Sequence, residues 1–204
     1  MRITGILGGS FNPIHNGHLA MAECAHRQFD IPEILLMPTS MTYYKDSSLL
    51  IDPEIRIEMI RIAIDEYGGK DYMKPSYLDI DRGGITYTFD TINELKGSYD
   101  KIFFIIGTDS LMYIDKWHKA AEFLPKCTLL VSRRSGNLED EVYIQYHYLT
   151  DAFGADILFM DTEIMPFSSS DIRERIRDGR PVDGMLPESV IRYIEKNRLY
   201  IKYH

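Results

Sequence analysis

Cysteine is scarce in this sequence, and long apolar runs are absent from it. The 204 residues include only Cys24 and Cys127, each inside an apolar stretch, so we expect buried thiols in place of a disulfide framework. No apolar run approaches the ~18 residues that suggest a membrane span. The sequence also lacks the pattern of a signal peptide, in which a positively charged segment is followed by an apolar segment and a cleavage site of small residues. These absences predict a soluble, cytoplasmic protein with no membrane partner.

Positive charge is also in deficit. Lys and Arg together number 23 against 31 Asp and Glu, which gives a formal net charge of −8. Broad binding to nucleic acid needs a basic face, so we expect no nucleic-acid partner, although a local basic pocket remains open. The length and the hydrophobic content of 45% suit one buried core. We expect a single domain over residues 1–204, with the C-terminal helices from about residue 168 packed against it. No heptad pattern indicates the oligomeric state, which leaves a homo-oligomer open.

Short apolar runs alternate with longer helical patterns along the chain. Strands are predicted for the runs at residues 3–7, 33–37, 77–80, 101–107, 127–132 and 156–160. Helices are predicted at 17–29, 52–67, 88–96, 110–124, 168–179 and 187–197, and an acidic stretch occupies 138–153. The apolarity of FFII and TLLV is continuous, which suits strands buried on both faces. The predicted fold class is therefore α/β, with a doubly wound parallel sheet covered by helices.

Capping signals and loops place the candidate site at one edge of that sheet. Asp52, Pro53 and Glu54 form an N-cap, a first helical proline and an early acid. Long loops are predicted at 38–50 and 132–140, and both follow predicted strands. Open α/β sheets bind ligands at the carboxyl ends of their strands, so we expect a binding crevice there.

The stretch GGSFNPIHNGH, residues 8–18, carries the strongest chemical signal. Gly8 and Gly9 let the backbone approach a ligand closely, and Pro13 stiffens the turn. A helix that begins near Gly17 would point its unpaired N–H groups into the loop, where they attract phosphate. Taken alone, the same glycines would form an ordinary connector.

Two histidines belong to this stretch. His15 and His18 add imidazole donors that could bind phosphoryl oxygens and stabilise charge on a leaving group. As a lone H-x-x-H pair they would more often be two exposed side chains. A zinc site is a further alternative, since Cys24 and His26 are also capable of binding a metal, but no clear third ligand has a helical spacing.

The complete string GGSFNPIHNGHL resembles the signature of the nucleotidylyltransferase superfamily and, more closely, of the bacterial nicotinate-nucleotide adenylyltransferases, whose signature contains H-x-G-H. Three further segments resemble motifs of that family in the same order: ITYTFDT at 85–91, IIGTDSL at 105–111 with Trp117, and SSSDIR at 168–173. The resemblance runs nearly from end to end. It implies a Rossmann-like nucleotidyltransferase fold and transfer of an adenylyl group from ATP to nicotinate mononucleotide, giving deamido-NAD and pyrophosphate in NAD biosynthesis.

The resemblance also implies roles for individual residues. The catalytic residues are expected to be His15, His18, Arg173 and Lys45. The residues expected to bind ATP are Gly8, Gly9, Ser10, Phe11, His15, His18, Gly107, Asp109, Arg133, Ser168, Ser169 and Arg173. The residues expected to bind the mononucleotide are Lys45, Thr86, Tyr87, Thr88 and Trp117. In the family, the tryptophan stacks on the pyridine ring and the backbone around Thr86 to Thr88 receives the ring carboxylate.

Several of these residues have plain structural interpretations as well. Ser168 to Ser170 suit a helix N-cap, Asp109 suits another cap, and Trp117 suits a core anchor. Arg133 after a strand could simply be solvated. The family usually carries P-P-H-K after its second strand, whereas this chain has MTYYK. If Lys45 binds the mononucleotide, its loop must therefore reach the site by a different path.

The chemistry expected at the site is positioning and charge neutralisation. Two helix N-termini facing one crevice suit a polyphosphate such as ATP, and Mg²⁺ is expected on the triphosphate, although the sequence shows no dedicated metal cage. Nicotinamide mononucleotide, phosphopantetheine and cytidylyl substrates stay open as alternatives within this chemistry. A nucleotide-binding module without catalysis is the alternative from another class.

Overall fold

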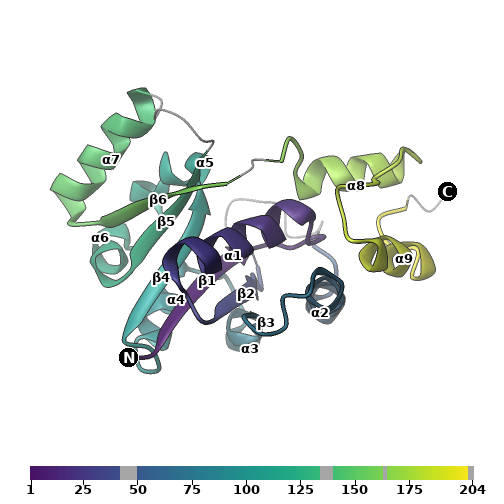
Figure 1. Ribbon diagram of the computed structural model, residues 1–204, viewed down its shortest axis with the longest axis horizontal. Coiled ribbons are helices and arrows are strands. Elements are labelled where there is room, and N and C mark those ends of the chain that lie inside the picture. Colours follow the sequence, from purple (N-terminus) through teal and green to yellow (C-terminus); the bar gives the residue numbers. More distant parts are fainter. Residues whose placement is uncertain (42–49, 134–139, 163–164, 202–204) are drawn as a thin grey trace.

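The protein is built on one six-stranded sheet. The computed structural model describes residues 1–41, 50–133, 140–162 and 165–201. The strands have the order β3-β2-β1-β4-β5-β6, and every pair of neighbours is parallel. Their bounds are β1 (Ile3–Gly9), β2 (Ile34–Pro38), β3 (Met73–Pro75), β4 (Lys101–Gly107), β5 (Thr128–Arg133) and β6 (Asp156–Asp161). The predicted α/β class with a parallel sheet is confirmed (Figure 1).

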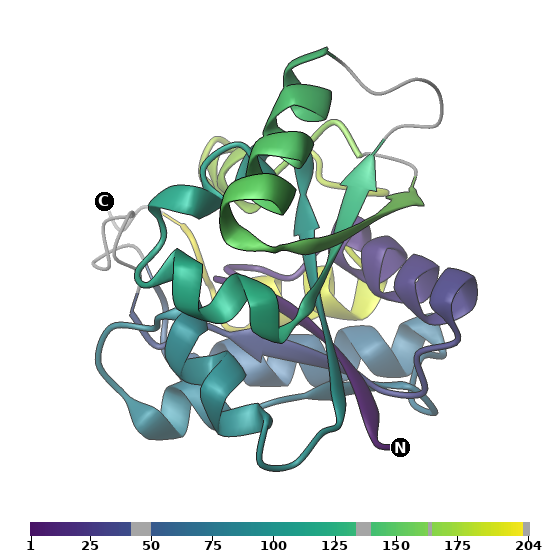
Figure 2. The ribbon, with the colours of Figure 1, turned by 90° about the vertical axis from the view of Figure 1, so that its left-hand side faces the viewer.

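Helices cover both faces of the sheet. The helices described are α1 (Asn16–Phe29), α2 (Pro53–Tyr67), α3 (Leu78–Arg82), α4 (Thr88–Leu95), α5 (Thr108–Leu111), α6 (Ala120–Phe123), α7 (Asp140–Phe153), α8 (Ser169–Arg177) and α9 (Glu188–Lys196). One apolar cluster joins the sheet to α1, α2, α8 and α9, and a second joins it to α4, α5, α6 and α7 (Figures 1 and 2). Neighbouring strand residues such as Leu7 and Ile6 enter opposite clusters, because side chains alternate along a strand.

The strand order reverses between β1 and β4. From β1 the chain builds outward through β2 to β3, and from β4 it builds the other way through β5 to β6. Such a switch point opens a crevice outside the carboxyl ends of the strands. Gly8 and Gly9 end β1 and Gly107 ends β4, so the predicted glycines lie at this crevice.

Two predicted elements are wrong. The run YLDI at 77–80 is predicted as a strand, but Leu78–Arg82 forms the short helix α3, and the third strand is the preceding Met73–Pro75. A three-residue strand is too short to show the period of two on which the prediction depends. The continuous helix predicted at 110–124 is broken into short turns, because Trp117 is extended and Lys119 has a φ of 52°.

The C-terminal helices pack onto α2 and α1. The backbone N–H groups of Glu188 and Ser189 donate to the carboxylate of Glu66 at 2.9 and 2.6 Å. The side-chain amide of Asn16, the first residue of α1, donates to the carbonyl of Gly184 at 2.8 Å. These contacts tie the segment from about residue 168 to the rest of the chain, while the single-domain division stays a prediction.

The two cysteines are free. Cys127 is 6% exposed, as expected of a buried thiol, whereas Cys24 is only partly buried and its Sγ donates to the carbonyl of Asp161 at 3.2 Å. Over the ranges that the structure describes, no helix has the length and apolarity to cross a membrane.

Candidate active site

Two cavities lie at the carboxyl edge of the sheet. The larger has a volume of about 440 Å³, and its lining includes the end of β1, from Gly8 to Ser10, together with Thr86, Tyr87, Thr88 and Trp117. The smaller has a volume of about 170 Å³, and its lining includes His15, Gly107 and Asp109. The residues predicted for the mononucleotide that the structure describes therefore gather at one cavity, and part of the set predicted for ATP gathers at the other.

The loop from Ser10 to Pro13 is held by side chains from distant elements. The carbonyl of Ser10 accepts a hydrogen bond from Nη1 of Arg56 at 2.9 Å, and the carbonyl of Asn12 accepts one from Nη1 of Arg173 at 2.8 Å. The carbonyl of Pro13 accepts from the hydroxyl of Ser169 at 2.8 Å. Three carbonyls of this largely buried loop are thus paired, which holds the loop in one conformation.

The same loop contains a strained residue. Phe11 has a φ of 43°, which a residue with a side chain rarely adopts, and it is fully buried. Its ring lies 4.8 Å from the ring of His18, centroid to centroid. The hydroxyl of Tyr200 donates to Oδ1 of the next residue, Asn12, at 2.9 Å. Strain of this kind persists only where the surroundings enforce it, and it is common at binding sites.

The two histidines form a stacked pair at the start of α1. Their ring centroids are 3.6 Å apart with an interplanar angle of 24°. The backbone N–H of His15 donates to Nδ1 of His18 at 3.2 Å, so a neutral His18 carries its proton on Nε2. Burial lowers the pKa of His15 to about 4, which keeps this ring neutral near pH 7. The pair therefore offers hydrogen-bond donors to a phosphate without placing two full charges side by side.

Gly17 leaves space beside the ring of His15. A Cβ atom at position 17 would lie 3.1 Å from Nδ1 of His15 and 3.5 Å from Cβ of Met165. The first distance is shorter than ordinary van der Waals contact, so a side chain here would displace the imidazole. Sequence reasoning named Gly17 only as the start of a helix and left it out of the site residues.

The N-terminus of α8 meets the loop of residues 10–13. Ser168 is its N-cap, and the hydroxyl of Ser168 donates to Oδ2 of Asp171 at 2.7 Å. Ser169 and Arg173 instead point to the loop, through the bonds to Pro13 and Asn12. Nη2 of Arg173 also donates to the hydroxyl of Ser170 at 3.2 Å. The start of α8 thus contacts the loop that precedes α1, and the roles of these residues toward ATP stay predictions.

Several predicted residues that the structure describes are absent from the lining of both cavities: Phe11, His18, Arg133, Ser168, Ser169 and Arg173. Nε of Arg133 forms an ion pair with Oδ1 of Asp161 at 3.0 Å, and its guanidinium lies 5.7 Å from the ring centroid of Phe159. Neither cavity has Arg133 among its described lining residues. Lys45 lies outside the described residues.

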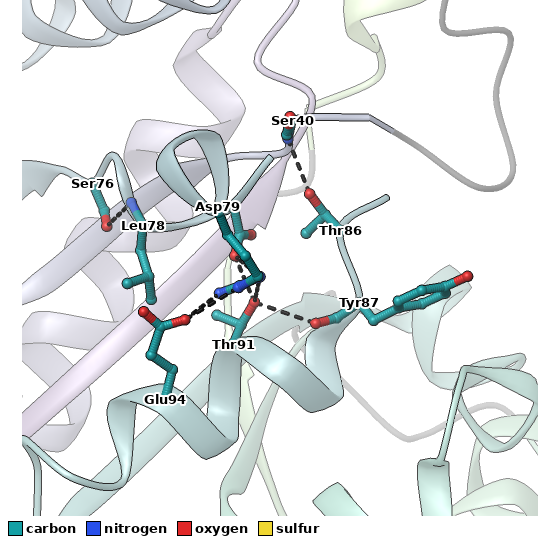
Figure 3. Close-up of polar contacts among 9 residues, drawn as sticks. Ser40, Ser76, Leu78, Asp79, Thr86, Tyr87, Thr91 and Glu94 are labelled. Atoms are coloured by element: carbon teal, nitrogen blue, oxygen red, sulfur yellow. Dashed lines mark hydrogen bonds and ion pairs between the residues drawn. The ribbon is translucent and has the colours of Figure 1, made fainter. Parts of the chain in front are cut away.

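The wall of the larger cavity is a local polar network (Figure 3). The hydroxyl of Thr86 accepts from the backbone N–H of Ser40 at 3.0 Å, and the N–H of Thr86 donates to the carbonyl of Met41 at 3.1 Å. The hydroxyl of Thr91 donates to Oδ1 of Asp79 at 2.6 Å and lies 3.3 Å from the carbonyl of Tyr87. The segment before α4 is therefore anchored on both sides.

The rest of the larger cavity is aromatic and apolar. The ring of Trp117 meets the ring of Phe104 edge-on, at 6.1 Å between centroids and 84° between planes. Lys116 and His118 flank Trp117 in the lining, and Ile6 lies on the sheet side. A planar ring bearing a polar substituent suits such a cavity. Sequence reasoning missed Lys116 and His118, because their neighbours in the chain predict a continuous helix.

Arg56 and Asp79 are the other residues that sequence reasoning missed. Arg56 is 0% exposed although arginine is rarely buried, and nothing in its helical pattern distinguishes it from a solvated charge. Asp79 is 4% exposed and lines the larger cavity. Its pairing with Arg82, three residues later, is the one signal that the sequence carried.

The zinc alternative has no support. Nδ1 of His26 bonds to the carbonyl of Ile31 at 2.8 Å, and its ring stacks on Tyr72 at 4.0 Å. Within the described parts of the chain, no group of three or more His, Cys, Asp or Glu side chains could hold a metal ion.

Comparisons with known proteins agree with this geometry. A model of the cytidylyltransferase-like family matches residues 6–175. A relative from Clostridium botulinum, strain Eklund 17B, named "Probable nicotinate-nucleotide adenylyltransferase", is 34% identical over 200 residues and 98% of each chain. A relative of the same name from Dehalococcoides mccartyi is 35% identical over 202 residues, covering 98% of this chain and 97% of the other.

Solved structures share the fold. Plasmodium falciparum nicotinic acid mononucleotide adenylyltransferase complexed with NaAD matches with a TM-score of 0.73 at 20% identity, covering 98% of each chain. The same protein complexed with APC matches with a TM-score of 0.72 at 20% identity and the same coverage. At this identity the likeness concerns the fold alone.

Proposed function

This chain belongs to the cytidylyltransferase-like family, and the relatives compared above carry the name "Probable nicotinate-nucleotide adenylyltransferase"; on that premise we propose that it adenylates nicotinate mononucleotide. The products are deamido-NAD and pyrophosphate. The observation that carries the proposal is the pair of cavities at the sheet switch point, one lined by Trp117 and Thr86 to Thr88, the other by His15. An adenylyltransferase must hold two nucleotides so that their phosphates meet, and this arrangement provides for both.

The reaction needs no covalent intermediate on the protein. A phosphate oxygen of the mononucleotide attacks the α-phosphorus of ATP, a new P–O bond forms, and the bond from the α-phosphorus to the bridging oxygen breaks. Pyrophosphate leaves with the electron pair of that bond. Positioning in line and neutralisation of the phosphate charge can therefore supply the catalysis.

The loop of residues 8–18 and the N-terminus of α8 would hold the phosphates. His15 and His18 donate hydrogen bonds to phosphoryl oxygens on which charge develops. Arg173 and the serines before it bind the β- and γ-phosphates, since a planar guanidinium suits paired phosphate oxygens. The contact between Arg173 and the carbonyl of Asn12 supports this role, because it holds the cation beside the loop.

The larger cavity would take the nicotinate. Trp117 offers its face to the pyridine ring, and the backbone before α4 offers N–H groups to the ring carboxylate. The N–H of Thr86 is paired with the carbonyl of Met41, so this role falls to the N–H groups that follow it at the start of α4. Anions are favoured at a helix N-terminus.

Magnesium would enter with the substrate. Nucleotidyltransferases of this kind generally use a divalent metal with ATP, and the described residues contain no separate cluster of His, Cys, Asp or Glu for it. We therefore assign Mg²⁺ to the triphosphate, where it neutralises phosphate charge.

The test is release of pyrophosphate from ATP and Mg²⁺ with three acceptors in parallel. We expect strong release with nicotinate mononucleotide, weak release with nicotinamide mononucleotide and none with phosphopantetheine. Release with a different acceptor alone would overturn the substrate. Binding of ATP without release in any mixture would overturn catalysis and favour a nucleotide-binding module.

A further inference from the structure

A carboxylate lines the cavity proposed for nicotinate. Asp79 is 4% exposed and belongs to the lining of the larger cavity. Its Oδ1 accepts from the hydroxyl of Thr91 at 2.6 Å and from Nη1 of Arg82 at 2.9 Å. Both of these bonds are accepted by the same oxygen of the carboxylate. A buried anion thus borders a cavity whose proposed occupant is itself an anion, which would disfavour binding if nothing balanced the charge.

Arg82 supplies that balance. It lies three residues after Asp79 in α3, and its side chain is 24% exposed. On its other side, Nε and Nη2 donate to Oε2 of Glu94 at 3.1 and 2.9 Å, but the side chain of Glu94 is 49% exposed and water screens its charge. Arg82 therefore bonds to two carboxylates, of which Asp79 is buried and Glu94 is in contact with water.

The other ionisable groups in the lining lie farther toward solvent. Lys116 and His118 are exposed residues beside Trp117, and Nζ of Lys116 lies 5.2 Å from the ring centroid of Tyr113. A charge in a poorly solvated place is compensated chiefly by the partner that touches it, because solvent weakens the rest. Burial also raises the pKa of the Asp79 carboxyl, against the hydrogen bond from Thr91 and the charge of Arg82.

We infer that the ion pair of Asp79 and Arg82 is what lets this cavity accept the acid substrate. Arg82 cancels the charge of Asp79, and this permits the carboxylate of the nicotinate ring to enter the cavity. The inference rests on the proposed function and names the charge form that its site accepts. Asp79 and Arg82 act on specificity through charge, and neither takes part in the phosphoryl chemistry.

The experiment compares kcat/KM for nicotinate mononucleotide and nicotinamide mononucleotide at saturating ATP. Arg82→Gln leaves Asp79 as an unpaired buried anion, so the ratio of acid to amide falls about tenfold or more. The double variant Asp79→Asn/Arg82→Gln removes both charges and restores the ratio to within about threefold of the wild-type value. Both substrates are measured on one preparation, so any inactive fraction cancels in the ratio.

Two single variants control for a structural effect. Asp79→Asn keeps an oxygen to accept from Thr91 and removes the charge, so the ratio stays the same or rises. Glu94→Gln removes the outer partner of Arg82 and leaves the buried pair in place, so the ratio does not change.

Three outcomes overturn the inference. The double variant could stay as impaired as Arg82→Gln, which would show that the pair acts structurally. Asp79→Asn could lose activity equally with both substrates, as expected if the Asp79 carboxylate accepts a hydrogen bond from a ribose hydroxyl. All variants could keep a clear wild-type preference for the acid, in which case the inference fails and the proposed function stands. If the wild-type protein uses neither mononucleotide, the proposed function fails and takes the inference with it.

Discussion

The two walls of the crevice are held in different ways. The loop of residues 10–13 is paired with Arg56, Ser169, Arg173 and Tyr200, whose separations along the chain from their partners are 46, 156, 161 and 188 residues. The wall before α4 is held mainly by Asp79, Arg82, Thr91 and Glu94, whose side-chain bonds span 12 residues or fewer. The phosphate side is thus held by contacts across the whole fold. The nicotinate side is held largely by bonds within residues 79–94, to which Thr86 adds its two bonds with Ser40 and Met41.

This difference suits the two tasks. Transfer between phosphates demands accurate positioning, and a loop tied to several distant elements has little freedom to move. Selection of a ring substituent needs only a local arrangement of charge and backbone donors. A change in the local wall should therefore alter substrate choice and leave the phosphate chemistry intact.

The largest effect is expected from removing an imidazole on the phosphate side. His18→Ala deletes a proposed donor to the reacting phosphates, so kcat should fall by about 10²–10³ while the KM for nicotinate mononucleotide changes little. Steady-state kinetics with both substrates measures this, and a thermal melt checks that the variant is folded. His147→Ala, at an exposed position in α7, is the matched control. Full activity of His18→Ala would remove the histidine pair from the mechanism.

The next effect is a pH dependence of the free energy of unfolding, which arises from His15 on the phosphate side. The pKa of His15 is about 4 in the folded chain and near its ordinary value of 6.5 when unfolded, so the unfolded chain binds this proton more tightly. The contribution to stability is complete above about pH 6.5 and is lost as the pH falls toward 4, by about 3 kcal/mol at most. Urea denaturation of wild type and His15→Asn at about pH 7 and pH 5 measures it. Equal losses in the two proteins would contradict the assignment to His15.

The smallest effects are expected from two variants, each of which removes a single hydroxyl group from one of the two walls. Tyr200→Phe removes the bond to Asn12 and should lower the free energy of unfolding by about 1 kcal/mol and kcat by a few fold, with the KM for the mononucleotide unchanged. Thr91→Val removes the bond to Asp79 and should raise that KM by a few fold, with the KM for ATP unchanged. Kinetics with each substrate varied in turn distinguishes them. The comparison of the walls fails if both variants shift the same parameter.

Local patterns predicted the parts of the molecule that local physics controls. Continuous apolar runs such as KIFFIIG indicated buried parallel strands, and the sheet contains them. Asp52 caps α2 as predicted, since its Oδ1 accepts from the N–H of Glu54 at 2.8 Å. The segment around Trp117 was predicted wrongly as helix, because apolar spacing alone does not reveal a residue turned outward to line a cavity.

Long-range partners explain what remained hidden in the site. His15, Thr86 to Thr88 and Trp117 line the two cavities, and all of them belong to short motifs that can be recognised in the sequence. Arg56 had no such signal, because its importance depends on the carbonyl of Ser10, 46 residues away. Asp79 was hidden by the wrong prediction of a strand at 77–80, which separated it from Arg82 and Thr91.

The sequence by itself determined the fold class and the candidate phosphate-binding stretch, because strand apolarity and the string GGSFNPIHNGH are properties of neighbouring residues. Only the tertiary structure decided which side chains hold that stretch and which charge borders the larger cavity. A buried hydrogen bond or ion pair exists only when the chain path brings its two partners together and removes them from water, and neither condition can be read from one segment alone.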